Sequence, residues 1–430
     1  MKHLDKLIPI FIAVLATVPG IWLRFAGVHL ESIPMAFFAG LAILGASFLV
    51  LWACDVVQQD VSQALALALV ALIAVLPEYS VDMYFTWMAG KYPEGEYSQY
   101  AIANMTGANR LLIGIGWVLI VVISWIKTRK AVKLEPERAI ELFFLGAATI
   151  YAFIIPIKGN LAWYDCIVFI GLFVWYIILA SKRPCLECNL EGPAELIGNL
   201  PTKRRRIITA IMFLYSAGAI IANAEPFSEG LVGSGKVLGI DEFLLVQWLA
   251  PLASEAPEFT VALIFAFRGQ PGLALGSLLS AKVNQWTLLV GMIPGVYALS
   301  SGQLAHPIPM NVLQMHEILL TAAQSLLGVA LLAAFSLSFG SALLLLVLFL
   351  GQFIISPWMD SLAAKGLINF TGDKVHQVFS LIYVLISIFI IARKPSNIKR
   401  IFRGLKAEPV FYAVPSLEEK LKDQHGNRED

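Results

Sequence analysis

Runs of apolar residues, each about 20 positions long and separated by short polar segments, extend along most of this chain. A helix needs about 20 apolar residues to cross the hydrocarbon core of a bilayer. The runs predict twelve transmembrane helices, at residues 8–28, 34–57, 61–88, 98–126, 137–157, 161–181, 207–226, 240–268, 272–299, 313–335, 337–356 and 376–392.

The composition supports this interpretation. Of the 430 residues, 58% are hydrophobic and only 14% are charged, and the mean hydropathy is +0.75. A single core in water stops growing well before it could bury so much apolar surface. The net charge of +1 gives no overall field that would attract nucleic acid. Soluble enzymes, DNA-binding proteins and disulfide scaffolds are therefore excluded, and we predict an all-α polytopic membrane protein.

The distribution of Lys and Arg predicts the orientation. With the N-terminus inside, the cytoplasmic segments hold 21 of these residues and the outer segments hold 5. Because basic residues concentrate in cytoplasmic loops, we expect both termini in the cytoplasm of a multi-pass protein of the plasma or inner membrane. The first run follows Lys2 and Lys6 as a secretory signal would. It lacks a small-residue cleavage site, so we expect it to be retained as the first helix.

The two halves of the chain repeat. Helix starts at 34, 61, 98, 137 and 161 correspond to starts at 207, 240, 272, 313 and 337, with shifts of 173 to 179 positions. Corresponding helices are five spans apart, an odd number, so each pair crosses the membrane in opposite directions. The sequence thus predicts a five-plus-five inverted-topology repeat with an extra helix at each end. The predicted divisions are an N-terminal extra helix at 1–33, a first repeat at 34–181, a cytosolic linker at 182–206, a second repeat at 207–356, a C-terminal extra helix at 357–392 and a cytosolic tail at 393–430.

A Pro-Glu pair occurs inside one long apolar run of each half, as Pro77-Glu78 and as Pro257-Glu258. Proline removes a backbone donor and leaves a carbonyl of the preceding turn without its partner. In a membrane such a group is tolerated only where it faces protein, water or an ion. One copy could be a kinked helix with an incidental acid. Two copies at matching positions favour a nest of hard oxygen ligands for Na⁺, Ca²⁺ or a proton.

Each Pro-Glu run is followed by a helix rich in small and amide residues, at 100–114 and at 273–285. Small residues let helices approach closely, and the polar side chains among them can supply ligands. Packing alone is the alternative explanation for the small residues.

These motifs resemble the α-repeats of the calcium/cation antiporter superfamily, which includes sodium/calcium and calcium/proton exchangers. The resemblance rests on Leu76-Pro77-Glu78, on Ala256-Pro257-Glu258 and, in part, on the segment 101–109, and it covers about residues 60–300. It implies a secondary antiporter in which Glu78 and Glu258 bind the transported cation at the midplane, flanked by hydroxyl and amide ligands. The candidate ion-binding set is Glu78, Glu258, Glu255, Asp82, Ser254, Asn104, Asn109, Ser277 and Gln285, with Pro77 and Pro257 as the helix breaks.

The chain departs from that family pattern at several ligand positions. The expected serine is Ala108 in the first half and Ala281 in the second, and the last expected Asn or Asp is Leu112 or Gln285. Lys282 occupies an Asn position. Fewer hydroxyl ligands remain than several Na⁺ ions would need, which puts sodium coupling in doubt.

Two cations accompany the acids near the midplane. Placing a lone Lys or Arg there costs about 2.5–3.5 kcal/mol on insertion scales. We therefore expect Arg110 and Lys282 to be paired with carboxylates, either as structural salt bridges or as replacements for bound Na⁺. The net formal charge of the six side chains near the midplane is −2; they are Glu78, Asp82, Glu255, Glu258, Arg110 and Lys282. One divalent cation or two protons would balance it.

The sequence therefore predicts an antiporter that exchanges a metal cation, with Ca²⁺ favoured, for Na⁺ or H⁺. A sodium/proton antiporter, with Lys282 alternately pairing with a glutamate, is one alternative. A non-transporting membrane scaffold or sensor is another. No nucleotide-binding, hydrolase or metalloprotease motif is found, so we expect neither an enzyme nor a cofactor. The expected partners are the cation, its counter-ion and the lipid bilayer.

Two other groups of residues are interpreted more modestly. Cys185 and Cys188 form one C-x-x-C pair, which we interpret as an incidental cytosolic pair or as a metal or redox link. His316 and Glu317, at the start of the tenth predicted helix, are interpreted as membrane-interface residues, as are Asn223 and Glu225 at the end of the seventh.

Overall fold

The computed structural model describes residues 4–61, 73, 75–182, 190–304, 306–367 and 369–404. Cys185 and Cys188, most of the first part of the predicted third span and the tail after Gly404 lie outside these residues. The helices are α1 (Leu4–Ala26), α2 (Ser32–Val57), α4 (Leu76–Lys91), α5 (Tyr97–Leu111), α6 (Val118–Thr128), α7 (Ala139–Ala152), α8 (Ile154–Lys158), α9 (Trp163–Ala180), α10 (Gly192–Gly198), α11 (Thr202–Leu238), α12 (Glu242–Phe267), α13 (Pro271–Asn284), α14 (Val290–Ser301), α15 (Val312–Leu332), α16 (Phe339–Ala364), α17 (Gly372–Arg393) and α18 (Pro395–Gly404).

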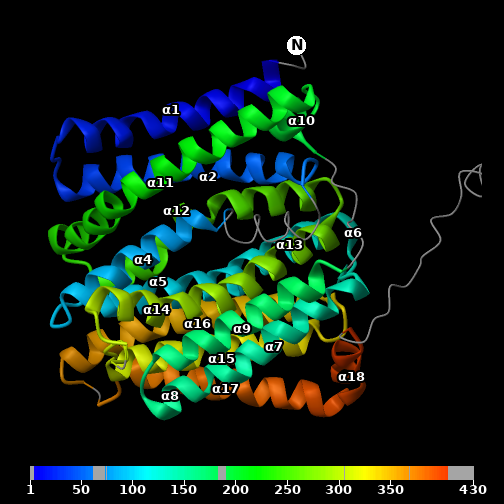
Figure 1. The fold of residues 1–430 in the computed structure, drawn as a ribbon. Helices are drawn as coiled ribbons and strands as arrows, with labels where there is room; N and C mark the ends of the chain where they lie inside the picture. Colours follow the sequence, from blue (N-terminus) through cyan, green and yellow to red (C-terminus); the bar gives the residue numbers. More distant parts are fainter. Residues whose placement is uncertain are drawn as a thin grey trace, which may run out of the picture.

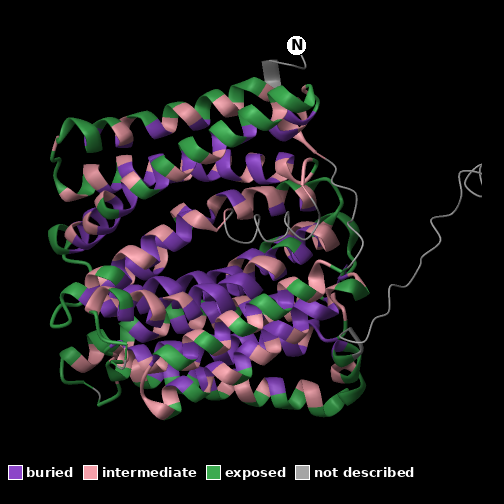
Figure 2. Ribbon diagram, viewed as in Figure 1, coloured by how far each residue is buried: buried purple, intermediate pink, exposed green. Residues whose placement is uncertain are grey.

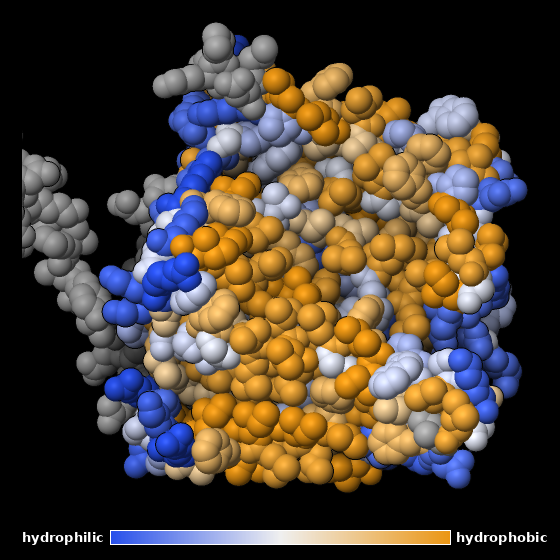
Figure 3. Space-filling view, turned by 180° about the vertical axis from the view of Figure 1, so that it is seen from behind, coloured by the Kyte–Doolittle hydropathy of each residue, from blue (hydrophilic) through white to orange (hydrophobic). Residues whose placement is uncertain are grey.

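The predicted all-α membrane architecture is confirmed. Among the described residues, ten helices are long and apolar enough to cross a membrane. The helices run side by side (Figure 1), and apolar side chains form a broad band between two polar rims on the face shown in Figure 3. The predicted count of twelve spans stays a prediction. Two of the twelve, represented by α4 and by the continuous helix from Pro271 to Ser301, are not among the ten.

Helix α11 is much longer than predicted. It covers 37 residues, from Thr202 to Leu238, where the apolar run predicted 207–226. Pro226 lies inside this helix without ending it. At 1.5 Å per residue the helix spans about 55 Å, well beyond a hydrocarbon core of about 30 Å. The apolar run therefore marks only the part of α11 that lipid can cover.

Two symmetric backbone pairings display the inverted repeat. Val132 in strand β1 (Val132–Lys133) pairs with Leu337 in strand β2 (Ser336–Leu337), and Leu161 forms an isolated bridge with Ile308. Adding 176 to Val132 and to Leu161 gives 308 and 337, so each pairing is the image of the other under the repeat. Two π-helical stretches, η1 (Leu112–Trp117) and η3 (Gln285–Leu289), begin 173 positions apart.

The helices form two groups that meet around α4 and α12. Helices α1, α2 and α11 pack together along one side of the molecule, with α4 and α12 between them and the larger bundle (Figure 1). The α2–α11 contact is close because Gly230 has no side chain there: a Cβ at that position would lie 2.7 Å from the backbone nitrogen of Ala36. Buried residues concentrate within the larger bundle (Figure 2). The Pro-Glu motifs of both halves thus lie where the two groups meet.

Candidate cation site

The first-half acid lies at the start of a helix. Helix α4 begins at Leu76, so Pro77 is in the first turn, where its missing N–H leaves no hydrogen bond unmade. Glu78 follows in the same turn, where the helix dipole favours a negative charge. Its side chain is 1% exposed, and neither carboxylate oxygen has a hydrogen-bond partner among the described residues. A carboxylate buried in this way requires a proton or a cation.

One helical turn later, Asp82 adds a second acid. Asp82 is fully buried, and Asn104 of α5 donates a hydrogen bond of 2.6 Å from Nδ2 to Asp82 Oδ1. Within the described part of the chain, Asp82 Oδ2 and Asn104 Oδ1 have no hydrogen-bond partner. Helices α4 and α5 therefore present oxygen atoms with unused lone pairs to the same region.

In the second half, α12 continues through both Pro251 and Pro257. Each proline deprives the carbonyl four residues earlier, at Gln247 or at Ala253, of its helical donor. Glu255 lies between the prolines and is 2% exposed. Gln285 donates a hydrogen bond of 2.8 Å from Nε2 to Glu255 Oε1, while Oε2 has no partner among the described residues.

Of the two acids on α12, Glu255 is more deeply buried than Glu258. Glu258 is only partly buried, although its Oε2 atom is buried and has no hydrogen-bond partner in the described part. Glu255 is 177 positions from Glu78, within the shifts of the repeat, whereas Glu258 is 180 positions away. Burial and repeat spacing therefore favour Glu255 as the counterpart of Glu78, one turn before the Glu258 to which the Pro-Glu match pointed.

Among the described residues, no carboxylate forms the ion pair with Lys282 that the sequence predicted. Its fully buried ammonium donates to Asn109 Oδ1 at 2.6 Å and to the Asn109 backbone oxygen at 3.1 Å. It also lies 4.6 Å from the centre of the Trp286 ring. The Asn109 amide in turn donates to the Met105 carbonyl. Asn109 and Lys282 are related by the repeat, and they join the two halves through an amide rather than an ion pair.

Arg110 is paired, but with an acid outside the predicted set. Its guanidinium forms an ion pair with Glu317 of α15, and both side chains are 2% exposed. The same guanidinium lies 5.0 Å from the centre of the Trp248 ring. Glu317 is therefore a core residue, and its interpretation as an interface residue was wrong. The same correction applies to Asn223, which is fully buried within α11.

Two predicted ligands do not fit the site. Ser277 is exposed on α13, so it faces away from the buried acids. Ser254 is buried, but its hydroxyl donates within its own helix, to the carbonyls of Ala250 at 3.2 Å and Pro251 at 3.4 Å. Few hydroxyl ligands therefore remain near the acids.

Close packing of α5 on α12 sets the geometry of the site. A Cβ on Gly107 would lie 1.8 Å from the backbone oxygen of Gln247, the carbonyl that Pro251 releases. The π-helical stretches begin three residues after Asn109 and Lys282, and Gln285 is the first residue of the second one. Such stretches occur frequently at functional sites. Neither the Gln247 carbonyl nor the π-helical stretches are evident from the sequence patterns, although Pro251 is a signal for the former.

The site is a group of oxygen acceptors that lack donors. On α4, α5, α12 and the second π-helical stretch, buried oxygens of the predicted ligands lack a hydrogen-bond partner among the described residues: Glu78 Oε1 and Oε2, Asp82 Oδ2, Asn104 Oδ1, Glu255 Oε2, Glu258 Oε2 and Gln285 Oε1. No three His, Cys, Asp or Glu side chains in the described part converge closely enough to hold a metal by themselves. A hard cation here would need amide and backbone oxygens as well, as Ca²⁺ commonly uses.

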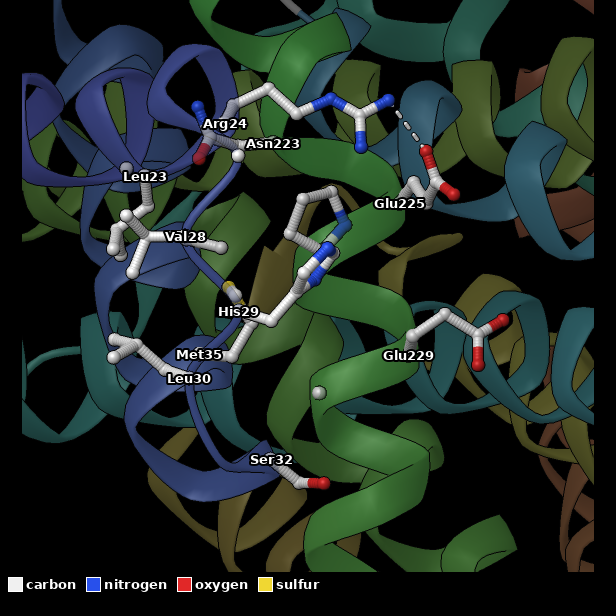
Figure 4. A pocket seen from close by; sticks show the side chains of 15 residues that line it. Leu23, Arg24, Val28, His29, Leu30, Ser32, Met35, Asn223, Glu225 and Glu229 are labelled. Atoms are coloured by element: carbon white, nitrogen blue, oxygen red, sulfur yellow. Dashed lines mark hydrogen bonds and ion pairs between the residues drawn. The ribbon is translucent and has the colours of Figure 1, made fainter.

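A cavity of about 260 Å³ opens between α1, α2 and α11. Figure 4 shows Arg24 directed toward Glu225, at 2.7 Å, with Glu229 further along α11. Glu229 accepts hydrogen bonds from Tyr84 of α4 at 2.7 Å and Tyr97 of α5 at 2.9 Å. The cavity therefore adjoins the helices that carry the first-half site residues.

Comparisons with known proteins found one matching family model and several similar solved structures. The family model described as sodium/calcium exchanger protein matches the chain twice, at residues 32–182 and 208–358. The crystal structure of the H⁺/Ca²⁺ exchanger CAX is 40% identical in sequence and superposes with a TM-score of 0.87, over 94% of this chain and 98% of that one. The sodium–calcium exchanger NCX_Mj is 21% identical with a TM-score of 0.49, over 74% of this chain and 96% of that one. The search of curated proteins found no match.

Proposed function

The chain belongs to the sodium/calcium exchanger family, and on that basis we propose that it exchanges Ca²⁺ for protons by alternating access. As a member of this family it is a multi-pass membrane exchanger of cations, not an enzyme. The identities of the cation and of the counter-ion are the parts that the proposal adds.

One observation supports the proposal most directly. Glu78 from the first repeat and Glu255 from the second each bury carboxylate oxygen without a donor in the described part of the chain. Two buried negative charges cannot stay unbalanced in a membrane interior. One Ca²⁺ cancels both, and so do two protons. Ions of either kind can therefore occupy the site in turn, and an empty charged site is disfavoured in between.

The surroundings of the acids favour protons over sodium as the counter-ion. The Ser254 hydroxyl is bound to its own helix, and Ala108 and Ala281 stand where the family pattern has serine. Lys282 occupies a position where the family pattern has Asn, and its contact with Asn109 holds it there. The relative at 40% identity is described as an H⁺/Ca²⁺ exchanger, which supports the same assignment.

The sodium/proton alternative has less support. It requires Lys282 to pair with a glutamate, and the contacts described for this ammonium are with Asn109 and Trp286.

For the movement, we place the alternation between the α1–α2–α11 group and the larger bundle. Site residues on α4 and α12 lie where these groups meet, and the cavity beside Glu225 and Glu229 gives cations an acidic entrance at one end. The excess of basic residues, 21 against 5, supports cytoplasmic termini, which puts this entrance on the opposite side.

The test is Ca²⁺ uptake into proteoliposomes driven by an imposed pH gradient. We expect the rate of Ca²⁺ uptake to increase with the size of the pH gradient. The rate should be the same whether the vesicles carry a Na⁺ gradient or contain K⁺ in place of Na⁺ throughout. Glu78→Gln and Glu255→Gln should each abolish uptake, because one carboxylate cannot balance a divalent ion. Glu94→Gln, on an exposed loop, is the matched control and should behave as wild type. Uptake driven only by Na⁺, or full activity in both site variants, would refute the proposal.

A further inference from the structure

A second buried group of charges lies apart from the cation site. Glu317 of α15 is 1% exposed and has two basic neighbours, an arginine and a histidine, from different helices. One carboxylate oxygen faces Arg110 of α5, and the other lies 3.3 Å from Nδ1 of His376 on α17. His376 is itself only 8% exposed. Helix α17 lies outside the matched repeats, so this group connects an addition to the fold with a helix of the first repeat.

Titratable groups connect this cluster with one end of the bundle. His316, in the first turns of α15, lies 2.5 Å from Gln377 Nε2 and 3.9 Å from Asp373, whose side chain is 33% exposed. His316 and Asp360 also lie within electrostatic range of His376. Titratable groups therefore lie at the Gly372 end of α17, from the partly exposed Asp373 to the buried His376.

We propose that Glu317 and His376 form a proton-binding site, distinct from the cation site, which is loaded from the Gly372 end of α17 and regulates exchange through Arg110.

The proposed proton binds on the ring of His376. His376 Nδ1 lies 3.3 Å from Glu317 Oε1, but it makes no hydrogen bond among the described residues. An added proton turns the ring into a cation that faces this carboxylate. The charged or titratable groups that interact with His376 are His316 and Glu317 on α15, Asp360 on α16 and Arg110 on α5, and Asp373 and Tyr383 of α17 neighbour His316 and Arg110 respectively.

Arg110 conveys the change to the cation site. When His376 is neutral, the Glu317 carboxylate forms an ion pair with Arg110 alone. When His376 is charged, the same carboxylate interacts with two cations, and its ion pair with Arg110 becomes weaker. Gln324 of α15 donates a hydrogen bond of 3.2 Å to the Arg110 carbonyl, and the next residue back along α5 is Asn109, which contacts Lys282. The α5–α15 contact thus links protonation of His376 to the Asn109–Lys282 contact.

The experiment uses His376→Asn in the full chain. The Asn amide can occupy the place of Nδ1 beside Glu317, but it cannot bind a proton. His306→Asn, exposed on the same end of the bundle, is the control. The first measurement is the unfolding temperature of each protein in detergent between about pH 5 and 8, the range in which histidine titrates. The difference between wild type and His376→Asn should change with pH, and that between wild type and His306→Asn should not. A constant difference for both variants would refute the proton site.

The second measurement is the exchange rate in right-side-out and inside-out membrane vesicles, and it depends on the proposed function. We expect wild type to show a rate component that titrates with pH on the Gly372 side only, and His376→Asn to lose it. Absence of Ca²⁺ exchange in wild type would refute the proposed function and leave the unfolding test to decide the proton site. Exchange with identical pH profiles in both proteins would refute the regulatory role alone.

Discussion

Replacing Gly107 by alanine tests the packing of α5 on α12. The added Cβ would lie 1.8 Å from the Gln247 backbone oxygen, 2.8 Å from its carbonyl carbon and 2.9 Å from its Cγ. Real Cβ atoms essentially never approach closer than 3.0 Å, so the two helices must separate by at least about 1.2 Å. The atom in the way is backbone, which cannot swing aside as the end of a side chain can.

Two consequences follow from that separation. Overpacking of a tight interface costs about 1–3 kcal/mol, so the variant should unfold at a lower temperature than wild type. The hydrogen bonds of Asn104 to Asp82 and of Lys282 to Asn109, each 2.6 Å long, flank Gly107 and should lengthen. A misplacement of about 1 Å in a site can lower a rate on the order of 100-fold, and we expect a loss of that order in Ca²⁺ uptake.

The matched control is Gly171→Ala on α9, where a Cβ would have no atom within 4 Å of it. Alanine lowers the conformational entropy of the unfolded chain relative to glycine. The variant should therefore be as stable as wild type or up to about 1 kcal/mol more stable. The measurements are thermal unfolding in detergent and Ca²⁺ uptake per reconstituted molecule. If Gly107→Ala matches Gly171→Ala in both, the close contact does not shape the site and the reasoning fails.

Two further predictions concern charged residues. Lys282→Gln removes the fixed positive charge beside the acids, so the KM for Ca²⁺ in uptake assays should fall on the order of tenfold while release slows; an unchanged or higher KM would contradict this. Hydrogen bonds from Arg205 lower the pKa of Asp60, in the turn after α2, from 3.8 to about 2. A carboxylate with a lowered pKa stabilises the fold above its unfolded value and loses that contribution as the pH falls through its folded value. The difference in unfolding temperature between wild type and Asp60→Asn should therefore be constant above about pH 5 and shrink between about pH 4 and 2; a difference that persists at pH 2 would contradict the assigned ion pair.

The architecture was predictable because it depends on patterns that are written along the chain. Apolar runs identify membrane helices whatever their neighbours are, and the regular shift between the halves identifies the repeat. The length of α11 was not predictable in this way, because its ends leave the lipid while the backbone stays helical. The symmetric pairings of Val132 with Leu337 and of Leu161 with Ile308 confirm the repeat independently of side-chain chemistry.

The site was predictable only in part, because contacts between helices depend on how each helix is rotated. The Pro-Glu motif pointed to Glu258, whereas packing against Gln285 buries Glu255 more deeply. Counting charges predicted carboxylate partners for Lys282 without showing that an amide lies nearer. Glu317 looked like an interface residue because its partner, Arg110, is 207 positions away in the sequence. Each of these differences between prediction and structure has the same cause: the contacts of the side chain depend on a neighbour that lies on another helix.

The Asn109–Lys282 contact has a consequence for the resting state of the molecule. If the halves of such a molecule were identical, its two access states would be related by a two-fold axis in the membrane plane and would have equal energy. Here Asn109 occupies one of the two equivalent positions and Lys282 the other, so the two access states differ in energy. The population at rest must then favour one side of the membrane, by an amount set by how differently the two states accommodate a single buried ammonium.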